Sequence, residues 1–394
     1  MRLSSGLGLG SVGLCCVGAL VALGAGCSSS SSGGGGATAS DNCNSSGVVC
    51  TLQPQSPSGG SATTITTAHN YAMQTLYLGD TDRTGTPNMT AWESFGYNLD
   101  GLVTTKTSSD VCTLAQGSSK TTQVDGKGGI DNSFGENILP IVITTAGSDA
   151  STKINQSIQD GSFTIMSYVV GFDNTAGSTA NATGLTGVLL AGGNYATAND
   201  GGVPAFNLTT HWPIRPELLT GCPGNICPAG TNPITASTVQ FPNAYQADGT
   251  FVNGSPATID VSLSIGGQAL DINVHSALIT YEPGTTAGTV TNGTIAGTIV
   301  TTELIASLMG VAGHISTSLC SGSAFASISQ QITQASDIII DPSSGAVTNT
   351  AGTACNGISI GLGFDADEIA LPTSADIAGP TPPAPDPCAD AGGE

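Results

Sequence analysis

Basic residues are scarce in this chain of 394 residues, which contains 7 Lys and Arg against 28 Asp and Glu, for a formal net charge of −21. A chain this poor in cations cannot gather the phosphate contacts on which nucleic-acid binding depends, so we expect no nucleic-acid partner. Charged residues make up only 9% of the chain. Its solubility must therefore rest on Ser, Thr, Asn and Gly, as is common among exported bacterial β-proteins.

The chain also lacks the short motifs of common catalytic sites. It contains no G-x-S-x-G nucleophile elbow, no P-loop and no Rossmann fingerprint. A hydrolytic triad would have to use one of four histidines, which are His69, His211, His275 and His314. We expect His275 to be solvated on the polar face of a strand, and His211 to lie in a loop packed by Trp212.

One set of carboxylates remains as a catalytic candidate. Asp365, Asp367 and Glu368 lie near the end of the last predicted strand, and two carboxylates about 5 to 9 Å apart would suit glycoside hydrolysis. Aromatic residues, which usually form the sugar platforms of such enzymes, are only 5% of the chain. A solvated acidic strand edge gives the same pattern. We therefore expect no enzymatic activity, with a secreted hydrolase of the glycosidase type as an alternative.

The N-terminus carries the most informative pattern. Arg2 precedes an almost uncharged apolar run over residues 7–26, which ends in small residues directly before Cys27. This pattern predicts a secretory signal peptide of the bacterial lipoprotein type over residues 1–26, with lipidated Cys27 as the new N-terminus. Leu23 lies one position further from the cysteine than the usual pattern has it. An uncleaved membrane anchor is the alternative, which the lack of a following positive charge disfavours.

The rest of the chain divides by composition. Residues 27–62 contain the lipidated cysteine and a Ser/Gly-rich tether, residues 63–372 a β-rich extracytoplasmic domain, and residues 373–394 a Pro-rich acidic tail. Ser28 follows the cysteine in place of Asp, which by analogy with enterobacterial lipoproteins favours the outer membrane. Acyl chains such as palmitate would hold the protein there.

Cysteine usage fits an oxidising compartment. Without Cys15, Cys16 and Cys27, eight cysteines remain: Cys43, Cys50, Cys112, Cys222, Cys227, Cys320, Cys355 and Cys388. An even number in an exported chain predicts up to four disulfides. Cys222 and Cys227 form the firmest predicted pair, because a turn-forming Pro-Gly lies between them. Cys320 and Cys355 are the next, since the helix and turn between them could return the chain to the same edge. The partner of Cys112 stays open among Cys43, Cys50 and Cys388.

Hydrophobic periodicity predicts a mostly β core. Two strands of period 2, residues 259–265 and 270–274, flank a Gly-Gly turn and have one aliphatic and one polar face. Further strands are predicted over residues 162–171, 185–191, 277–282, 289–300 and 357–371. Helical periodicity covers residues 136–159, with Pro140 in the first turn, and shorter stripes at 304–312 and 325–335. We therefore predict a mainly β (minor α+β) fold, an antiparallel β-sandwich or jelly-roll-like core with two or three short capping helices.

The densest polar stretch, residues 79–137, is the candidate metal site. Clustered Asp, Asn and Glu on Gly-rich loops can supply the roughly six to eight oxygens that a calcium ion takes. The candidate ligands are Asp80, Asp82, Asp100, Asp125, Asp131 and Glu136. The spacing does not fit an EF-hand, and turns and helix caps are the favoured alternative. A zinc site is not expected, because no cysteine or histidine pair has ligand spacing.

Three motifs carry a family resemblance. They are W-x-x-F-G-Y-N-L-D-G at 92–101, D-G-x-G-G-I-D-N-S-F-G-x-N at 125–137 and G-I-S-I-G-L-G-F at 357–364. With the Ser/Gly tether, they resemble a group of uncharacterised bacterial lipoproteins over residues 70–372. The resemblance implies an envelope location and a common fold, and no activity.

The sequence as a whole predicts a lipid-anchored cell-envelope protein with a binding or structural role. The alternatives are a calcium-dependent carbohydrate-binding module and the hydrolase. The expected partners are the membrane, through the lipid, and a carbohydrate or another envelope protein.

Overall fold

The computed structural model describes residues 49–146, 150–255, 257–265, 268–315, 317–320 and 322–379. The predicted signal peptide, Cys27 and the tether up to residue 48 lie outside these residues, as does the predicted tail from residue 380 onward. Within the described part of the chain, no helix is both long enough and apolar enough to cross a membrane.

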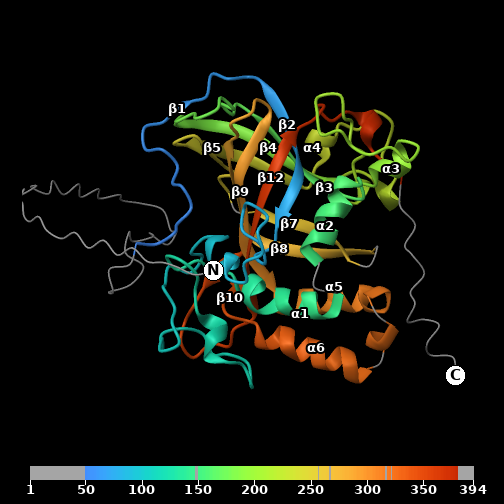
Figure 1. The fold of residues 1–394 in the computed structure, drawn as a ribbon. Helices are drawn as coiled ribbons and strands as arrows, with labels where there is room; N and C mark the ends of the chain where they lie inside the picture. The colour runs from blue at the N-terminus through green and yellow to red at the C-terminus, as the bar shows by residue number, and fades with distance from the viewer. Residues whose placement is uncertain are drawn as a thin grey trace, which may run out of the picture. The chain divides into compact units, whose positions relative to one another are not determined.

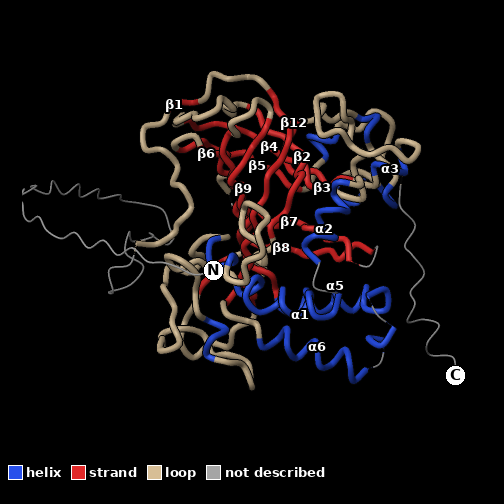
Figure 2. The backbone as a smooth tube through the Cα atoms, in the orientation of Figure 1, coloured by secondary structure: helices blue, strands red, loops and turns tan. Residues whose placement is uncertain are grey.

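Eight antiparallel strands of the described chain close into a barrel (Figures 1 and 2). Their order is β4-β3-β2-β12-β9-β8-β6-β5, and β5 pairs again with β4. Their bounds are β2 (Ala68–Tyr77), β3 (Thr164–Val170), β4 (Ala182–Gly192), β5 (Val239–Ala247), β6 (Thr250–Val252), β8 (Gln268–Pro283), β9 (Thr289–Val300) and β12 (Gly357–Glu368).

The mainly β class is confirmed, but the core is a barrel and not the predicted β-sandwich or jelly roll. Alternating apolar residues give a sheet one buried face, and either a second sheet or closure of the same sheet can cover that face. Closure depends on the pairing of β4 with β5. The strand pattern carries no signal for that long-range pairing.

Four more strands lie outside the barrel path. β1 (Ser61–Ala62) pairs in parallel with β4, and β10 (Ile339–Asp341) pairs with β11 (Ala346–Thr348) in a separate two-stranded sheet. β7 (Ala257–Ile265) pairs antiparallel with β8, with Ile265 opposite Gln268. This is the hairpin predicted around the Gly-Gly turn, and the other predicted strands coincide with β3, β4, β8, β9 and β12.

Aromatic side chains fill the barrel. Phe251 and Tyr281 stack with ring centroids 4.5 Å apart, and Phe172 packs edge-to-face against both. Tyr71 from β2 and Phe364 from β12 pack on Tyr281. All five side chains are at most 1% exposed. Because an eight-stranded barrel is just wide enough for side chains to fill it, this interior is a packed core.

Four helices of eight or more residues pack around the described barrel: α1 (Leu139–Ala146), α2 (Ala150–Gln159), α5 (Thr301–Ile315) and α6 (Gly322–Gln334). α2 packs against β2, α5 against β8, and α6 against α5; α1, α5 and α6 lie together below the strands in Figure 1. All three predicted helical segments are present. The first is divided into a π-helical turn, η3 (Phe134–Ile138), then α1 and α2, with Pro140 in the first turn of α1.

Short helical turns complete the described chain. They are α3 (Tyr195–Ala198), α4 (Pro233–Ala236), η1 (Ala91–Ser94), η2 (Lys120–Gln123), η4 (Pro216–Leu218), η5 (Pro223–Asn225), η6 (Thr317–Cys320) and η7 (Ser374–Asp376).

Helix α5 covers part of the polar face of β8. His275 is only 8% exposed, and its Nε2 lies 2.8 Å from Oε2 of Glu303 on α5. The prediction that His275 is solvated is therefore wrong. Alternation assigns a residue to one face of a sheet, but it does not say whether a helix covers that face.

Candidate functional site

The three motifs of the sequence meet on the outer face of β12. Residues 91–137, which we call the loop layer, run in cyan beside the strands in Figure 1. The outward-facing positions of β12 include two glycines. A Cβ on Gly361 would lie 2.1 Å from the carbonyl oxygen of Phe95, and one on Gly363 would lie 2.5 Å from its ring. The glycines of the G-L-G sequence therefore let the loop layer rest directly on the strand.

Asn132 joins the three motifs through its side-chain amide. Its Nδ2 donates to the carbonyl oxygens of Trp92, Phe95 and Gly361 at 2.9–3.2 Å. Its Oδ1 accepts from the backbone N–H groups of Gly135 and Gly361 at 3.0 Å. Asn132 is 2% exposed. Because an unpaired polar group buried away from water is costly, this side chain fixes the loop layer on β12.

Four aspartates form a group beside this junction, which we call the carboxyl cluster: Asp131 and Asp337, which are buried, and Asp100 and Asp125, which are half-buried. The first three come from the loop layer and Asp337 from the turn before β10. Each accepts a backbone N–H: Asp100 from Leu102 at 2.8 Å, Asp125 from Thr104 at 2.5 Å, Asp131 from Leu99 at 2.6 Å and Asp337 from Ser359 at 2.9 Å.

Burial sets the protonation of the cluster. Loss of hydration, reinforced by the neighbouring carboxylates, raises the pKa of Asp125 to about 9, that of Asp337 to about 7, and that of Asp131 well above its usual range. Burial also raises the pKa of Asp100, to which Asp110 adds repulsion. Among the described residues, no Lys or Arg forms a salt bridge with these carboxyls. Burial and mutual repulsion therefore favour the protonated forms of these carboxyls.

The structure gathers half of the predicted calcium ligands. Asp100, Asp125 and Asp131 share the cluster, whereas Asp80 accepts from Ser151 on α2 at 2.5 Å and Asp82 lies in an exposed turn. Glu136 lies on η3, where burial raises its pKa to about 7. In the part of the chain that the structure describes, no three His, Cys, Asp or Glu side chains are placed to hold a metal ion. Calcium binding stays a prediction.

Two of the predicted ligands have the turn geometry of the alternative interpretation. Asp82 accepts from the N–H of Thr84, and Asp100 from the N–H of Leu102, each two residues further on. Asp337, which sequence reasoning missed, lies between a helical stripe and an Ile-Ile-Ile run. An acid directly before a buried apolar run was the available signal.

A disulfide ties the loop layer to the segment that precedes β12. It joins Cys112 and Cys355, which are 243 positions apart in the sequence. The predicted pairing of Cys320 with Cys355 is therefore wrong, and the partner of Cys112 is none of the three cysteines among which the sequence left it open. Helix α6 has 13 residues and carries the chain roughly 20 Å away from Cys320 before it reaches the start of β12. Cys320 is nevertheless disulfide-bonded, as is Cys50.

The second disulfide joins Cys222 and Cys227, as the sequence predicts. The intervening Pro223 and Gly224 form the 3-10 turn η5, in which Gly224 has a φ of 61°. Glycine adopts this left-handed conformation without steric cost, so the two cysteines can meet across four residues.

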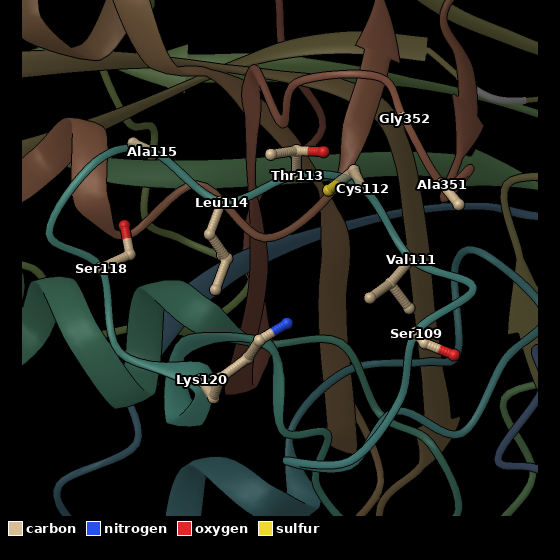
Figure 3. Close-up of a pocket in the computed structure, with 10 residues that line it drawn as sticks. All are labelled: Ser109, Val111, Cys112, Thr113, Leu114, Ala115, Ser118, Lys120, Ala351 and Gly352. Carbon is tan, nitrogen blue, oxygen red and sulfur yellow. The ribbon is translucent and has the colours of Figure 1, made fainter.

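A pocket of about 440 Å³ lies beside the first disulfide (Figure 3). One wall is the chain from Ser109 to Lys120, and the other includes Ala351 and Gly352. Cys112 lies where the two walls meet. The pocket and the carboxyl cluster are neighbours, because Cys112 Sγ lies 3.3 Å from the carbonyl oxygen of Asp337.

The remaining sequence candidates are engaged in local contacts. Tyr77 donates to Asp365 at 2.7 Å, and Glu368 lies 2.7 Å from Nδ1 of His69. Asp367 neighbours Asp365, and burial raises its pKa. These carboxylates thus contact different partners along β12.

The segment around His211 is a loop packed by its tryptophan, as predicted. Trp212 is 2% exposed, donates from Nε1 to the carbonyl oxygen of Gly193 at 2.8 Å, and packs against Tyr195 and Phe206. His211 itself lies 3.2 Å from Asp376 and is half exposed.

Comparison of this chain with protein-family models, with characterised proteins and with solved structures finds no match.

Proposed function

We propose that this chain is a lipid-anchored cell-envelope protein that acts through the outside of its barrel, in a binding or structural role. The observation that carries the proposal is the packed barrel interior, which leaves the loops, helices and outer face to make contacts. Two disulfides support an oxidising location. The lipoprotein signal of the sequence supports the anchor on the outer membrane.

The anchor is tested at Cys27, which lies outside the described residues. Cells that express the chain would be fed radiolabelled palmitate, with a Cys27→Ala variant and a Cys16→Ala control in parallel. We expect label in the parent and the control, and none in Cys27→Ala. Label that persists in Cys27→Ala would refute the anchor, and fractionation of the labelled cells tests the outer-membrane location.

We propose a calcium-dependent carbohydrate-binding module as the second candidate, because of the carboxyl cluster. Carboxyls gathered at buried and half-buried positions without a basic partner favour neutralisation by protons or by a cation. Calcium, which takes oxygen ligands, would be the fitting cation if the loops adjust around it.

Thermal unfolding in millimolar calcium and in chelator tests this second candidate. Binding would stabilise the fold by about 2.7 kcal/mol at a hundredfold excess over Kd, and the gain would disappear in Asp131→Asn. Equal melting temperatures in the two solutions would show that these acids bind no calcium and serve only as turn and hydrogen-bonding residues. A glycan array with and without calcium then tests the carbohydrate.

A further inference from the structure

The pocket beside the Cys112–Cys355 disulfide has the features of a small-molecule site. Its volume of about 440 Å³ lies within the range of ligand pockets, roughly 300 to 1,000 Å³. Val111, Leu114 and Ala115 supply apolar surface, while Ser109 and Thr113 supply hydroxyl groups. The lining presents polar and apolar surface in about equal amounts, and the pocket is open to solvent, so a small molecule with one polar end and one apolar end could contact both kinds of surface.

The pocket is held in shape by bonds across its walls. Besides the disulfide, Thr113 N–H donates to the carbonyl oxygen of Thr353 at 2.7 Å, and Cys355 N–H donates to that of Thr113 at 3.0 Å. On the other side, Nε2 of Gln334 on α6 donates to the carbonyl oxygen of Gln116 at 3.0 Å. A preformed pocket loses little entropy when a ligand binds, which favours affinity.

The charge in the pocket comes from Lys120. Figure 3 shows its side chain extending inward between Leu114 and Val111. In the described chain, no hydrogen bond or salt bridge occupies its ammonium group. Lys127, in contrast, donates to Ser94 at 2.7 Å, and Arg83 donates to the carbonyl oxygen of Gly293 at 3.0 Å. Lys120 is thus an available cation in a chain of net charge −21.

These features select the ligand by charge and size. An ammonium group attracts an anion, whereas the strongly negative field of the whole chain repels polyanions such as nucleic acids and polyphosphates. Among anions, a small molecule with one carboxylate is repelled least. The rest of such a molecule can contact the apolar side chains of the pocket. We propose that this pocket binds a small organic carboxylate, with the ammonium of Lys120 on the carboxylate and Leu114 and Val111 against the apolar body.

The inference does not depend on the lipid anchor or on calcium, so it can fail or hold independently of the proposed function. The probe is N-acetyl-alanyl-alanine, which has one carboxylate, compared with its C-terminal amide, which has none. Binding to the full-length chain in detergent would be followed by NMR titration of ¹⁵N-labelled protein. The matched variants are Lys120→Gln and Lys127→Gln, since Lys127 lies outside the pocket lining.

We expect the acid to bind about fivefold more tightly than the amide, as an accessible ion pair allows. Its shift changes would centre on residues 109–120, Lys120→Gln would bind acid and amide alike, and Lys127→Gln would keep the difference. Equal binding of acid and amide by the parent chain would overturn the proposal. So would shift changes that centre elsewhere, or no binding of the acid at millimolar concentration.

Discussion

The barrel interior and the loop layer are both buried, but they are stabilised in different ways. The interior contains aromatic rings, such as those of Phe251 and Tyr281, which are stabilised by removal from water and by close packing. The loop layer buries Asn132 and the carboxyl cluster, in which each polar atom depends on a particular partner. A change of volume should therefore weaken the barrel interior, and the loss of one hydrogen-bonding partner should weaken the loop layer.

The largest expected effect comes from removing the crosslink that joins the loop layer to the barrel. The chain-entropy model gives about 5 kcal/mol for a loop as long as that closed by Cys112–Cys355, and about 2 kcal/mol for the short loop of Cys222–Cys227. We expect Cys112→Ser with Cys355→Ser to lower the urea midpoint far more than the matching change at Cys222 and Cys227. Equal losses would show that the crosslink does not hold the loop layer.

The interior should respond to a loss of volume. Phe364→Ala removes a fully buried ring that packs on Tyr281 and should cost about 4 kcal/mol in the free energy of unfolding. Met89→Ala is the control, because Met89 is 67% exposed and its truncation should stay within about 0.5 kcal/mol. Calorimetry would measure both, and a loss below about 1 kcal/mol for Phe364→Ala would contradict a rigidly packed barrel.

The loop layer should respond to the loss of a single amide. Asn132→Ala leaves the Gly361 N–H and the Phe95 carbonyl without the partner that they share, at a cost of about 3 kcal/mol. Hydrogen exchange should show early loss of protection over residues 92–101, with the barrel strands still protected. Asn273→Ala, at an exposed position of β8, is the control. If the barrel strands and the loop layer lost protection together, the two regions would unfold as one unit, which would contradict their separate stabilisation.

The smallest expected effect is the contribution of Asp337, in the carboxyl cluster, to the pH dependence of stability. Unfolded aspartates titrate near pH 4, whereas folded Asp337 has a pKa of about 7. Between these values the folded chain binds more protons, so this stability is present below about pH 4 and is lost as pH rises through about 7. From Asp337 alone we expect a loss of about 2 to 3 kcal/mol between pH 5 and pH 8.

Paired variants isolate this contribution. Asp337→Asn should reduce the fall of the urea midpoint between pH 5 and pH 8 without abolishing it, because the pKa values of Asp125 and Asp131 are raised as well. Asp341→Asn should leave it unchanged, because hydrogen bonds from Ser343 and Ser344 hold the pKa of Asp341 at about 2, below the measured range. The opposite slope, with stability rising from pH 5 to pH 8, would show that the cluster is ionised in the folded chain.

Much of the fold was predictable because it follows from short-range patterns. Period-2 alternation located β3, β9 and β12, and helical stripes located α5 and α6. The short spacing of Cys222 and Cys227 sufficed for their disulfide. The acids at 100, 125 and 131 were identified as a group, although their joint burial was not. For these strands, helices and this disulfide, the deciding interaction lies within a few positions of the residue concerned.

The remaining features depend on contacts between segments that are distant in the sequence. The closure of β4 onto β5, the pairing of Cys112 with Cys355, the burial of His275 under α5 and the addition of Asp337 to the cluster all join segments that are far apart in the chain. Composition and periodicity indicate which face of a helix or strand prefers to be buried. They do not state which other element covers it, because that choice minimises the free energy of the whole packed chain.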